Sequence, residues 1–406
     1  MNGRTSVPSR STISLDSIDG DLVVGRHAVV KGTGTPPTVK VRGTIYCEGH
    51  NTFECNLLAE NLEAEDNVTL RGDLEIRDYI EVEDGRLEVY GNTRAQQVDI
   101  GEALYTSKDL TADKVDVGGS LEVDGNVKTN NIEVGGNFTA KGTVKAKDID
   151  VGGSLSIQSK VDIESLEVGG TATVHGGKIL EVDVGGSFES DESLEYESID
   201  VGGIVKLAGK NKGGQIEVGG LLRVDGDLEF EDIDVGGKVE ITGSGQGNMM
   251  EIGGKAQVGG SLKLTEDLEV GGKIEVGEEV SARNIEVGGK LSSRRADAEN
   301  RVEVGGAIDT REGLVAHFVE TGRRSEVHGC LKANEIIIGR DAHAENIYGK
   351  RILLRSGAQV DNVFGENITI ESHCQINGEV QYTNELRLGE HVSLVKAPQK
   401  VDKILF

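Results

Sequence analysis

The sequence has few aromatic residues, prolines and cysteines. Its 406 residues include no Trp, 7 Phe, 7 Tyr, 4 Pro and 4 Cys. So few aromatic side chains cannot fill several bulky cores, and we expect a thin, aliphatic core. The cysteines have no CxxC spacing, which speaks against a disulfide framework or a zinc site and favours buried small apolar residues at Cys47, Cys55, Cys330 and Cys374.

Long apolar runs are also missing. No run approaches the roughly 18 residues of a membrane-spanning helix, and the start of the chain, residues 1–12, is polar. We therefore expect a cytoplasmic protein with neither a signal peptide nor direct membrane insertion. The net charge of −27, from 70 acidic and 43 basic residues, disfavours nucleic acid as a partner.

Glycine is abundant, with 58 residues. It does not fall at every third position, which excludes collagen, and Val, Ile and Leu recur along nearly the whole chain, which argues against disorder. Together, these features suggest a repetitive fold.

A short motif, VGG or a close variant, recurs at nearly constant spacing. The usual gap between copies is about 17 residues, and only two of the twelve gaps differ from it, one shorter and one longer. Such a period over more than 200 residues is typical of a stacked architecture in which each unit contacts only its neighbours. The copies begin at Ile100, Val117, Val134, Val151, Val168, Val184, Val201, Val218, Val235, Ile252, Val270, Val287 and Val304.

Each repeat contains three pairs of apolar residues, and the two members of a pair are separated by one residue. This period of two is typical of a short strand with one buried face. Helices cannot fit the spacing, and such short strands must pair with their equivalents in the coils before and after. In the repeat that begins at Val270 the apolar residues are Val270, Ile274, Val276, Val280, Ala282 and Ile285.

The sequence therefore predicts an all-β protein, a single long parallel β-solenoid of triangular cross-section. Residues 13–394 would make about 22 turns of about 17 residues, and the strand spacing gives a length of about 105 Å. We expect the Gly pair at a corner, where glycine supplies positive φ and lets successive coils pack without a Cβ.

The pattern divides the chain into five parts. Gly and Pro at 32–37 indicate a loop inserted between early coils, and the last coils have a shorter period of about 16 residues. The predicted parts are a disordered polar tail at 1–12, less regular coils at 13–96, regular repeats at 97–320, coils of a second type at 321–395 and a C-terminal tail at 396–406 that serves as a cap or a joint.

The second type of coil resembles a known family. The run GAQVDNVFG at 357–365, then Ile368 and Ile370, then INGEV at 376–380, resembles the bactofilins, polymer-forming cytoskeletal proteins whose coils alternate A-x-V-x-G and I-x-I strands. The resemblance is best over 331–394. It implies a right-handed triangular β-helix that polymerises end to end without nucleotide into scaffold filaments. The chain departs from the family in its longer predicted solenoid and in having no hydrophobic membrane-targeting segment at its start.

The residue before each Val or Ile of the motif is an acid in all thirteen copies. Stacked about 4.8 Å apart, well inside the screening length of about 8 Å, these carboxylates should repel one another, and some pKa values should be raised. The row is either a cation-binding or partner-facing edge or a solvated face that prevents sideways association. Its members are Asp99, Asp116, Glu133, Asp150, Glu167, Asp183, Asp200, Glu217, Asp234, Glu251, Glu269, Glu286 and Glu303.

The third face of the solenoid is interrupted in three coils, where loops could bulge and form a docking site. The interrupting residues are Asn211, Lys212, Gly213 and Gly214, then Gly243, Gly245 and Gly247, then Arg294, Arg295, Asp297 and Glu299.

We find no candidate for catalysis, for a cofactor or for a metal. The eight His residues never recur at one repeat position with Asp or Ser, although His317, His328 and His343 fall within two coils. Hexapeptide-repeat acyltransferases are also triangular β-helices, but each of their coils needs three hexapeptides, one residue more than the period that dominates here. The Gly-rich segment 243–247 lacks the GKS or GKT ending of a phosphate loop.

A solenoid must cap its terminal strands or use them for joining. We therefore expect a non-enzymatic structural protein that polymerises end to end with copies of itself. The alternatives are a capped monomer that binds an unidentified protein along the acidic row or the irregular third face, and a secreted adhesin, which the missing signal disfavours. The candidate interface residues are Ile13, Leu15, Ile18, Leu22 and Val24 at one end and Leu386, Leu388, Val392, Leu394, Ile404, Leu405 and Phe406 at the other.

Overall fold

The computed structural model describes residues 3–404, so the candidate interface residues Leu405 and Phe406 lie outside the described part. The chain comprises two compact units, residues 1–202 and 203–406. Between residues 3 and 404 all regular structure is β-strand, and none of it is a helix that could cross a membrane.

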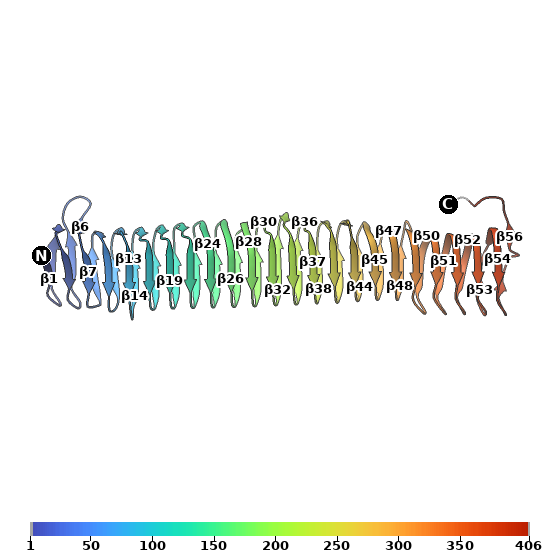
Figure 1. Cartoon of the computed structure of the whole chain (residues 1–406), viewed down its shortest axis with the longest axis horizontal. Coiled ribbons are helices and arrows are strands. Elements are labelled where there is room, and N and C mark those ends of the chain that lie inside the picture. Colours follow the sequence, from blue (N-terminus) through green and yellow to red (C-terminus); the bar gives the residue numbers. More distant parts are fainter. Residues whose placement is uncertain (1–2, 405–406) are drawn as a thin grey trace. The chain divides into compact units, whose positions relative to one another are not determined.

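Most regular coils hold three short strands that pair in parallel with their equivalents one coil later; at 144–184 two of the three run together into strands of eight residues. Val117, for example, lies opposite Val134, its equivalent in the next copy of the motif. The parallel β-solenoid is therefore confirmed, with about 23 turns over the two units against the 22 predicted. In Figure 1 the strands of each unit lie side by side, as for β19 (Lys114–Val117), β20 (Ser120–Val123) and β21 (Val127–Lys128), which pair with β22 (Asn131–Val134), β23 (Asn137–Ala140) and β24 (Val144–Val151).

The core is a set of aliphatic columns, because alternate residues of each strand face inward and stack on their equivalents. In β20, Leu121 and Val123 are 1% and 0% exposed, whereas Ser120 and Glu122 are exposed. The thin core expected from the composition is thus confirmed; its largest fully buried side chains are Phe53, Phe138 and Phe188.

The glycine pair of the motif serves close packing and not positive φ. None of these glycines has a positive φ, so that part of the prediction is wrong. A Cβ on Gly135 would lie 2.3 Å from the carbonyl oxygen of Gly118, and one on Gly152 would lie 2.5 Å from that of Gly135. The pair is therefore glycine because successive corners approach too closely for a side chain.

The first coil begins earlier than predicted. Residues 1–12 were expected to be disordered, but β1 (Arg4–Val7) pairs in parallel with β4 (Asp21–Val24), and Val7 is 1% exposed. The inward alternation of Thr5 and Val7 is too short to stand out in the sequence. The coil is completed by β2 (Thr12–Leu15) and β3 (Ser17–Ile18).

The inserted loop is found where it was predicted. It joins β5 (Val29–Gly32) to β6 (Thr38–Val41) and leaves the stack beside β6 in Figure 1. The coil continues after it, since β6 pairs with β9 (Asn56–Ala59) in regular parallel register.

The predicted bulges on the third face are wrong for two of the three segments, whereas in the third the strand register shifts between Asp297 and Arg301. The three segments form strands in the stack: β33 (Asn211–Lys212), β39 (Gly245–Gly247) and β47 (Arg295–Val304). Asn211 is 2% exposed, and its amide donates to the carbonyls of Ala208 and Gly209. Gly247 leaves room for an aromatic ring, because a Cβ there would lie 2.3 Å from Cε2 of Phe230.

The coils after residue 321 include turns shorter than the regular repeats, as predicted. His343 lies opposite Gln359, and neighbouring strands merge across one corner into long strands. These are β50 (Glu326–Ile338), β51 (His343–Leu354) and β52 (Gln359–Ile370).

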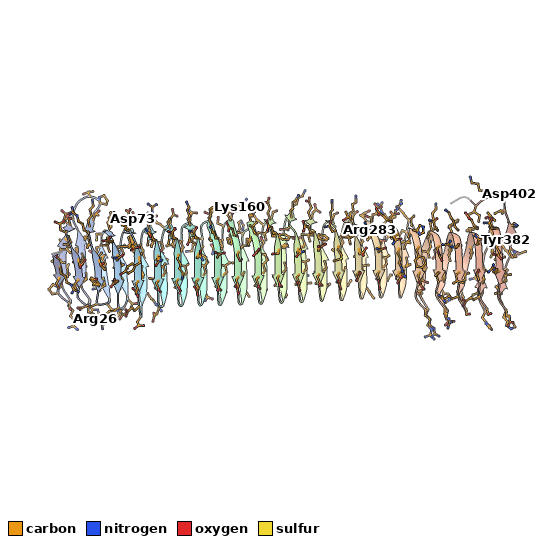
Figure 2. All side chains as sticks on the ribbon, in the orientation of Figure 1. Arg26, Asp73, Lys160, Arg283, Tyr382 and Asp402 are labelled. Carbon is orange, nitrogen blue, oxygen red and sulfur yellow. The ribbon has the colours of Figure 1, made fainter. Side chains whose placement is uncertain are left out.

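The described part of the C-terminal segment, 396–404, contains one short strand. The last strands are β53 (Gln375–Ile376), β54 (Val380–Leu388), β55 (Ser393–Leu394) and β56 (Gln399–Lys400), and β56 pairs with β54. After β56 the chain turns back along the outside of the stack (Figure 1), and Asp402 lies outside the coils (Figure 2). Ile404 is 7% exposed.

Candidate functional site

The acids that precede the motif form a continuous column in each unit, here called the acidic ladder. The register places them directly opposite one another from Asp99 to Asp200 in unit 1 and from Glu217 to Glu303 in unit 2. The ladder is longer than the sequence analysis recognised. It also contains Glu63, Glu81 and Glu320, in coils without the full motif.

Two carboxyl groups of the acidic ladder have raised pKa values. The pKa of Glu81 is raised by partial burial, then by the charges of Asp99 and Glu63. The pKa of Glu269 is raised by partial burial, then by its ladder neighbours. These shifts confirm the expectation that some members have raised pKa values.

The acidic ladder has few cations to offset its charge. Lys114 Nζ lies 3.5 Å from Asp116 and 3.9 Å from Glu133, and Arg301 forms an ion pair with Glu303 and lies 3.9 Å from Glu320. Between residues 3 and 404, no group of three or more His, Cys, Asp or Glu side chains could hold a metal ion. The acidic ladder is therefore a column of like charges with few ion pairs, and its role stays a prediction.

The C-terminal coil leaves apolar side chains uncovered. Leu388 is 48% exposed, Val395 is 66% exposed, and Leu386, Val392 and Leu394 are half-buried. One coil earlier the paired residues are fully covered, because a further coil lies on them: Ile368, Ile370 and Ile376 are 1%, 1% and 0% exposed.

The N-terminal coil is open in a similar way. Ile13 and Leu15 are half-buried, whereas Val30, the partner of Ile13 in the next coil, is 0% exposed. Not all predicted interface residues belong to this end. Ile18 is 9% exposed, and Leu22 and Val24, at 0%, lie in the second coil with a coil on either side.

A further feature, not recognised in the sequence, is a corner with a left-handed residue, here called the left-handed corner. It follows the strand on the face that carries the acidic ladder, here called the first face. The third residue beyond the last inward residue of that strand has a φ between 52° and 79°. Only the outer coils have it, because the regular repeats carry the glycine pair there. The left-handed residues are Arg10, His27 and His50 in unit 1 and Arg324, Asp341, Gly357, His373 and His391 in unit 2.

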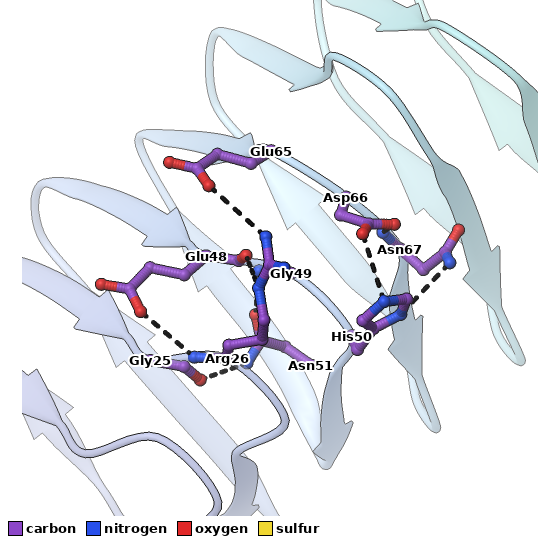
Figure 3. Close-up of polar contacts among 9 residues, drawn as sticks. All are labelled: Gly25, Arg26, Glu48, Gly49, His50, Asn51, Glu65, Asp66 and Asn67. Atoms are coloured by element: carbon purple, nitrogen blue, oxygen red, sulfur yellow. Dashed lines mark hydrogen bonds and ion pairs between the residues drawn. The ribbon is translucent and has the colours of Figure 1, made fainter.

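Polar side chains hold the left-handed corners of unit 1 together (Figure 3). Asn51 is 1% exposed; its Nδ2 donates to the Gly25 carbonyl at 2.7 Å, and its Oδ1 accepts from the Gly49 N–H at 3.1 Å. His50 Nε2 lies 3.2 Å from an Asp66 carboxylate oxygen. The ring of His50 also stacks on that of His27, with centroids 4.9 Å apart. These contacts are structural, since they join one coil to the next.

A hollow of about 610 Å³ lies on the third face of unit 1. Small residues such as Ala95 and Ala112 line it. Arg77, Arg94 and Lys128 line it and form no ion pair with the part of the chain described here, but Glu75 and Asp113 line it too. The mixed charges select no class of ligand.

Two of the three histidines singled out in the sequence do come together. His328 and His343 line a hollow of about 380 Å³ in unit 2, and His328 Nδ1 lies 3.2 Å from Glu345 Oε1. His317 does not line it. The four cysteines are free, and Cys47, Cys55 and Cys374 are buried, as expected of small apolar residues.

Comparison of the chain with known protein families, with curated proteins and with solved structures finds no match.

Proposed function

We propose that the protein is a non-enzymatic structural protein whose copies join end to end. The observation that carries this proposal is the state of the two terminal coils. Both leave inward-facing apolar residues half-covered, at Ile13 and Leu15 on one side and at Leu386, Leu388 and Leu394 on the other. Where a further coil lies on the stack, the partners Val30, Ile368, Ile370 and Ile376 are fully buried.

Joining would remove this apolar surface from water and extend the strand ladder. Full burial of a Leu or Ile side chain contributes about 2 kcal/mol, so several half-exposed side chains together supply a useful driving force. The outer edges of β1 and of residues 385–388 of β54 also carry backbone groups without a strand partner in residues 3–404. The resemblance of residues 331–394 to bactofilins supports the same function, a nucleotide-free scaffold in the cytoplasm.

A second candidate is a capped monomer that serves as a scaffold or adaptor for a protein partner. It is favoured by the C-terminal segment, because β56 pairs with part of β54 and Ile404 is buried. In that case the acidic ladder is the surface that faces the partner.

Electron microscopy and sedimentation at two protein concentrations separate the two functions. End-to-end joining produces filaments that lengthen as the concentration rises and that sediment accordingly. Particles of a single copy at every concentration would refute joining and leave the capped scaffold.

A further inference from the structure

We propose that the joint is head to tail and in register: β1 of one copy pairs in parallel with residues 385–388 of β54 in the next copy. This inference rests on the proposed function, and it names the partner surface and the polarity of the assembly. The hydrogen bonds of the left-handed corners and the columns of the first face both support this register.

The left-handed corners form a directional ladder of backbone hydrogen bonds. Wherever the next coil also has a left-handed residue, the N–H of the first one donates to the carbonyl of the residue just before the second. In unit 1 Arg10 donates to Arg26 at 2.9 Å, and His27 donates to Gly49 at 3.1 Å. In unit 2 the same bond is made by Arg324, Asp341, Gly357 and His373, which donate to Arg340, Ser356, Ser372 and Glu390.

This ladder ends with complementary groups at the two ends of the chain. His391 is the last left-handed residue, and its N–H makes no hydrogen bond within residues 3–404. Ser9 precedes Arg10, the first left-handed residue, and its carbonyl accepts none there. Placing the first coil of one copy on the last coil of another brings the His391 N–H to the Ser9 carbonyl and continues the ladder by one bond of the same kind.

The first face fits the same register. Val7 is paired with Val24 in β4, and Leu388 is paired with Ile370 in β52; both belong to the inward column that precedes the corner. Setting Val7 opposite Leu388 places Arg4 opposite Glu385 and Ser6 opposite Arg387. The apolar pair then stacks inward, and the outward pair of Arg4 and Glu385 has opposite charges.

Symmetric joints do not continue this ladder. Two N-terminal coils face to face would oppose two Ser9 carbonyls, and two C-terminal coils would oppose two His391 N–H groups. Only the head-to-tail arrangement pairs a donor with an acceptor at this corner. It also preserves the parallel direction of every strand pair assigned within the chain.

Pro8 distinguishes the joint from an ordinary coil boundary. Within the chain, the residue that follows the last inward residue of the first-face strand donates its N–H to a backbone carbonyl one coil earlier. Gly25 donates in this way to the Val7 carbonyl, and Gly389 donates to the Ile370 carbonyl. At the joint this donor would be Pro8, which has no N–H, so the Leu388 carbonyl lacks its bond. The joint is therefore weaker than a boundary between coils of one chain.

Cysteine cross-linking tests the register. We would prepare Ser6→Cys and Arg387→Cys as separate chains with different tags, mix them and oxidise. Both side chains are exposed, and the register sets their Cα atoms about 4.8 Å apart, within the range of a disulfide. We expect mixed cross-linked dimers and none from either variant alone.

The matched control replaces Arg387→Cys by Thr369→Cys. Thr369 is the partner of Arg387 one coil earlier, so its Cα would lie about 9.6 Å from that of residue 6, too far for a disulfide. The unmodified chain, oxidised in the same way, reports any contribution from Cys330, which is only half-buried.

The outcomes separate this inference from the proposed function. If the unmodified chain forms no polymer, end-to-end joining itself is wrong. If it polymerises but Ser6→Cys cross-links to itself, or if no disulfide forms between the two variants, the head-to-tail register is wrong. As a second measurement, Pro8→Ala restores one N–H and should lower the concentration needed for polymerisation about fivefold, the effect of one typical hydrogen bond; an unchanged concentration would also contradict the register.

Discussion

Asn51 shows how a single buried polar side chain holds two coils together. Its amide fills the space inside a left-handed corner and satisfies groups on two neighbouring coils, the Gly25 carbonyl and the Gly49 N–H. A polar residue at an inward position is tolerated here because the corner offers both a donor and an acceptor.

Asn51→Ala should therefore destabilise the protein by about 2 to 3 kcal/mol, since it leaves the buried Gly49 N–H without a partner. Urea unfolding would measure the loss. Asn67→Ala is a suitable comparison, because Asn67 is only partly buried. Its side-chain Oδ1 also accepts a hydrogen bond from a backbone N–H, that of Arg86. Equal stability of Asn51→Ala and the unmodified protein would show that the corner does not depend on this amide.

Glu269 gives the acidic ladder a measurable pH dependence. Its pKa in the folded protein is raised above the ordinary value of 4.5, so the folded state binds a proton before the unfolded state does as the pH falls. Glu269→Gln should be more stable than the unmodified protein at pH 7, by about 0.5 kcal/mol. This advantage should shrink as the pH falls through the raised pKa and disappear below 4.5.

Glu240 provides the control of opposite sign. Its pKa is lowered by bonds from Lys238 and Arg223, so its contribution is present above 4.5 and is lost as the pH falls through the lowered pKa. Glu240→Gln should therefore be less stable than the unmodified protein at pH 7. Denaturant unfolding from pH 7 to pH 4 compares both variants, and a pH-independent effect of Glu269→Gln would contradict repulsion within the ladder.

At the scale of the coil, the corners determine which repeats can stack. The glycine pair of the regular repeats allows carbonyls of successive corners to lie where a Cβ would be, whereas the outer coils use a left-handed turn with its own hydrogen-bond ladder. Strand pairing is the same in both types of coil, so the corner is what distinguishes the middle of the chain from its ends.

Gly152→Ala tests this packing. The added Cβ would lie 2.5 Å from the Gly135 carbonyl oxygen, so two coils must separate locally, at a cost of about 2 to 4 kcal/mol. Thermal or urea unfolding measures it. Gly3→Ala is the control, because nothing lies within 4 Å of its Cβ position. If Gly152→Ala changed the free energy of unfolding by less than about 0.5 kcal/mol, as an ordinary surface substitution does, the corners could accommodate a Cβ without separating.

At the scale of the whole molecule, the uncovered terminal coils and the like-charged sides have different consequences. Apolar ends favour joining, and a column of carboxylates on the side of each unit opposes contact between copies along that side. Assembly in one dimension follows when both hold.

Leu388→Asp should abolish joining while leaving the fold intact, because the side chain is 48% exposed and an unpaired carboxylate would have to be buried in the joint. Sedimentation should show single copies in place of polymers. The free energy of unfolding should change by about 0.5 kcal/mol or less. Tyr90→Asp, at a side chain 50% exposed in the middle of unit 1, should leave assembly unchanged. Polymers of normal length in Leu388→Asp would exclude the C-terminal coil as the joint.

The sequence by itself determined the period, the three short strands per coil, the inward residues and most of the acidic ladder. These features are local and repeated, so each copy of the motif strengthens the same interpretation, and burial follows directly from the alternation of apolar and polar residues. The inserted loop and the shorter coils after residue 321 were also predictable, from Gly and Pro in one case and from a change of spacing in the other.

Only the tertiary structure decided how irregular segments fit the stack and what remains open at the ends. The strand at Arg4–Val7 and the strands on the third face carry weak local signals, and they form because a neighbouring coil supplies the hydrogen bonds and, at Gly247, the ring of Phe230. The left-handed corners likewise depend on carbonyls from the next coil. Exposure of Leu388 and Ile13 depends on whether another coil lies on them, which is a property of the stack and not of the repeat.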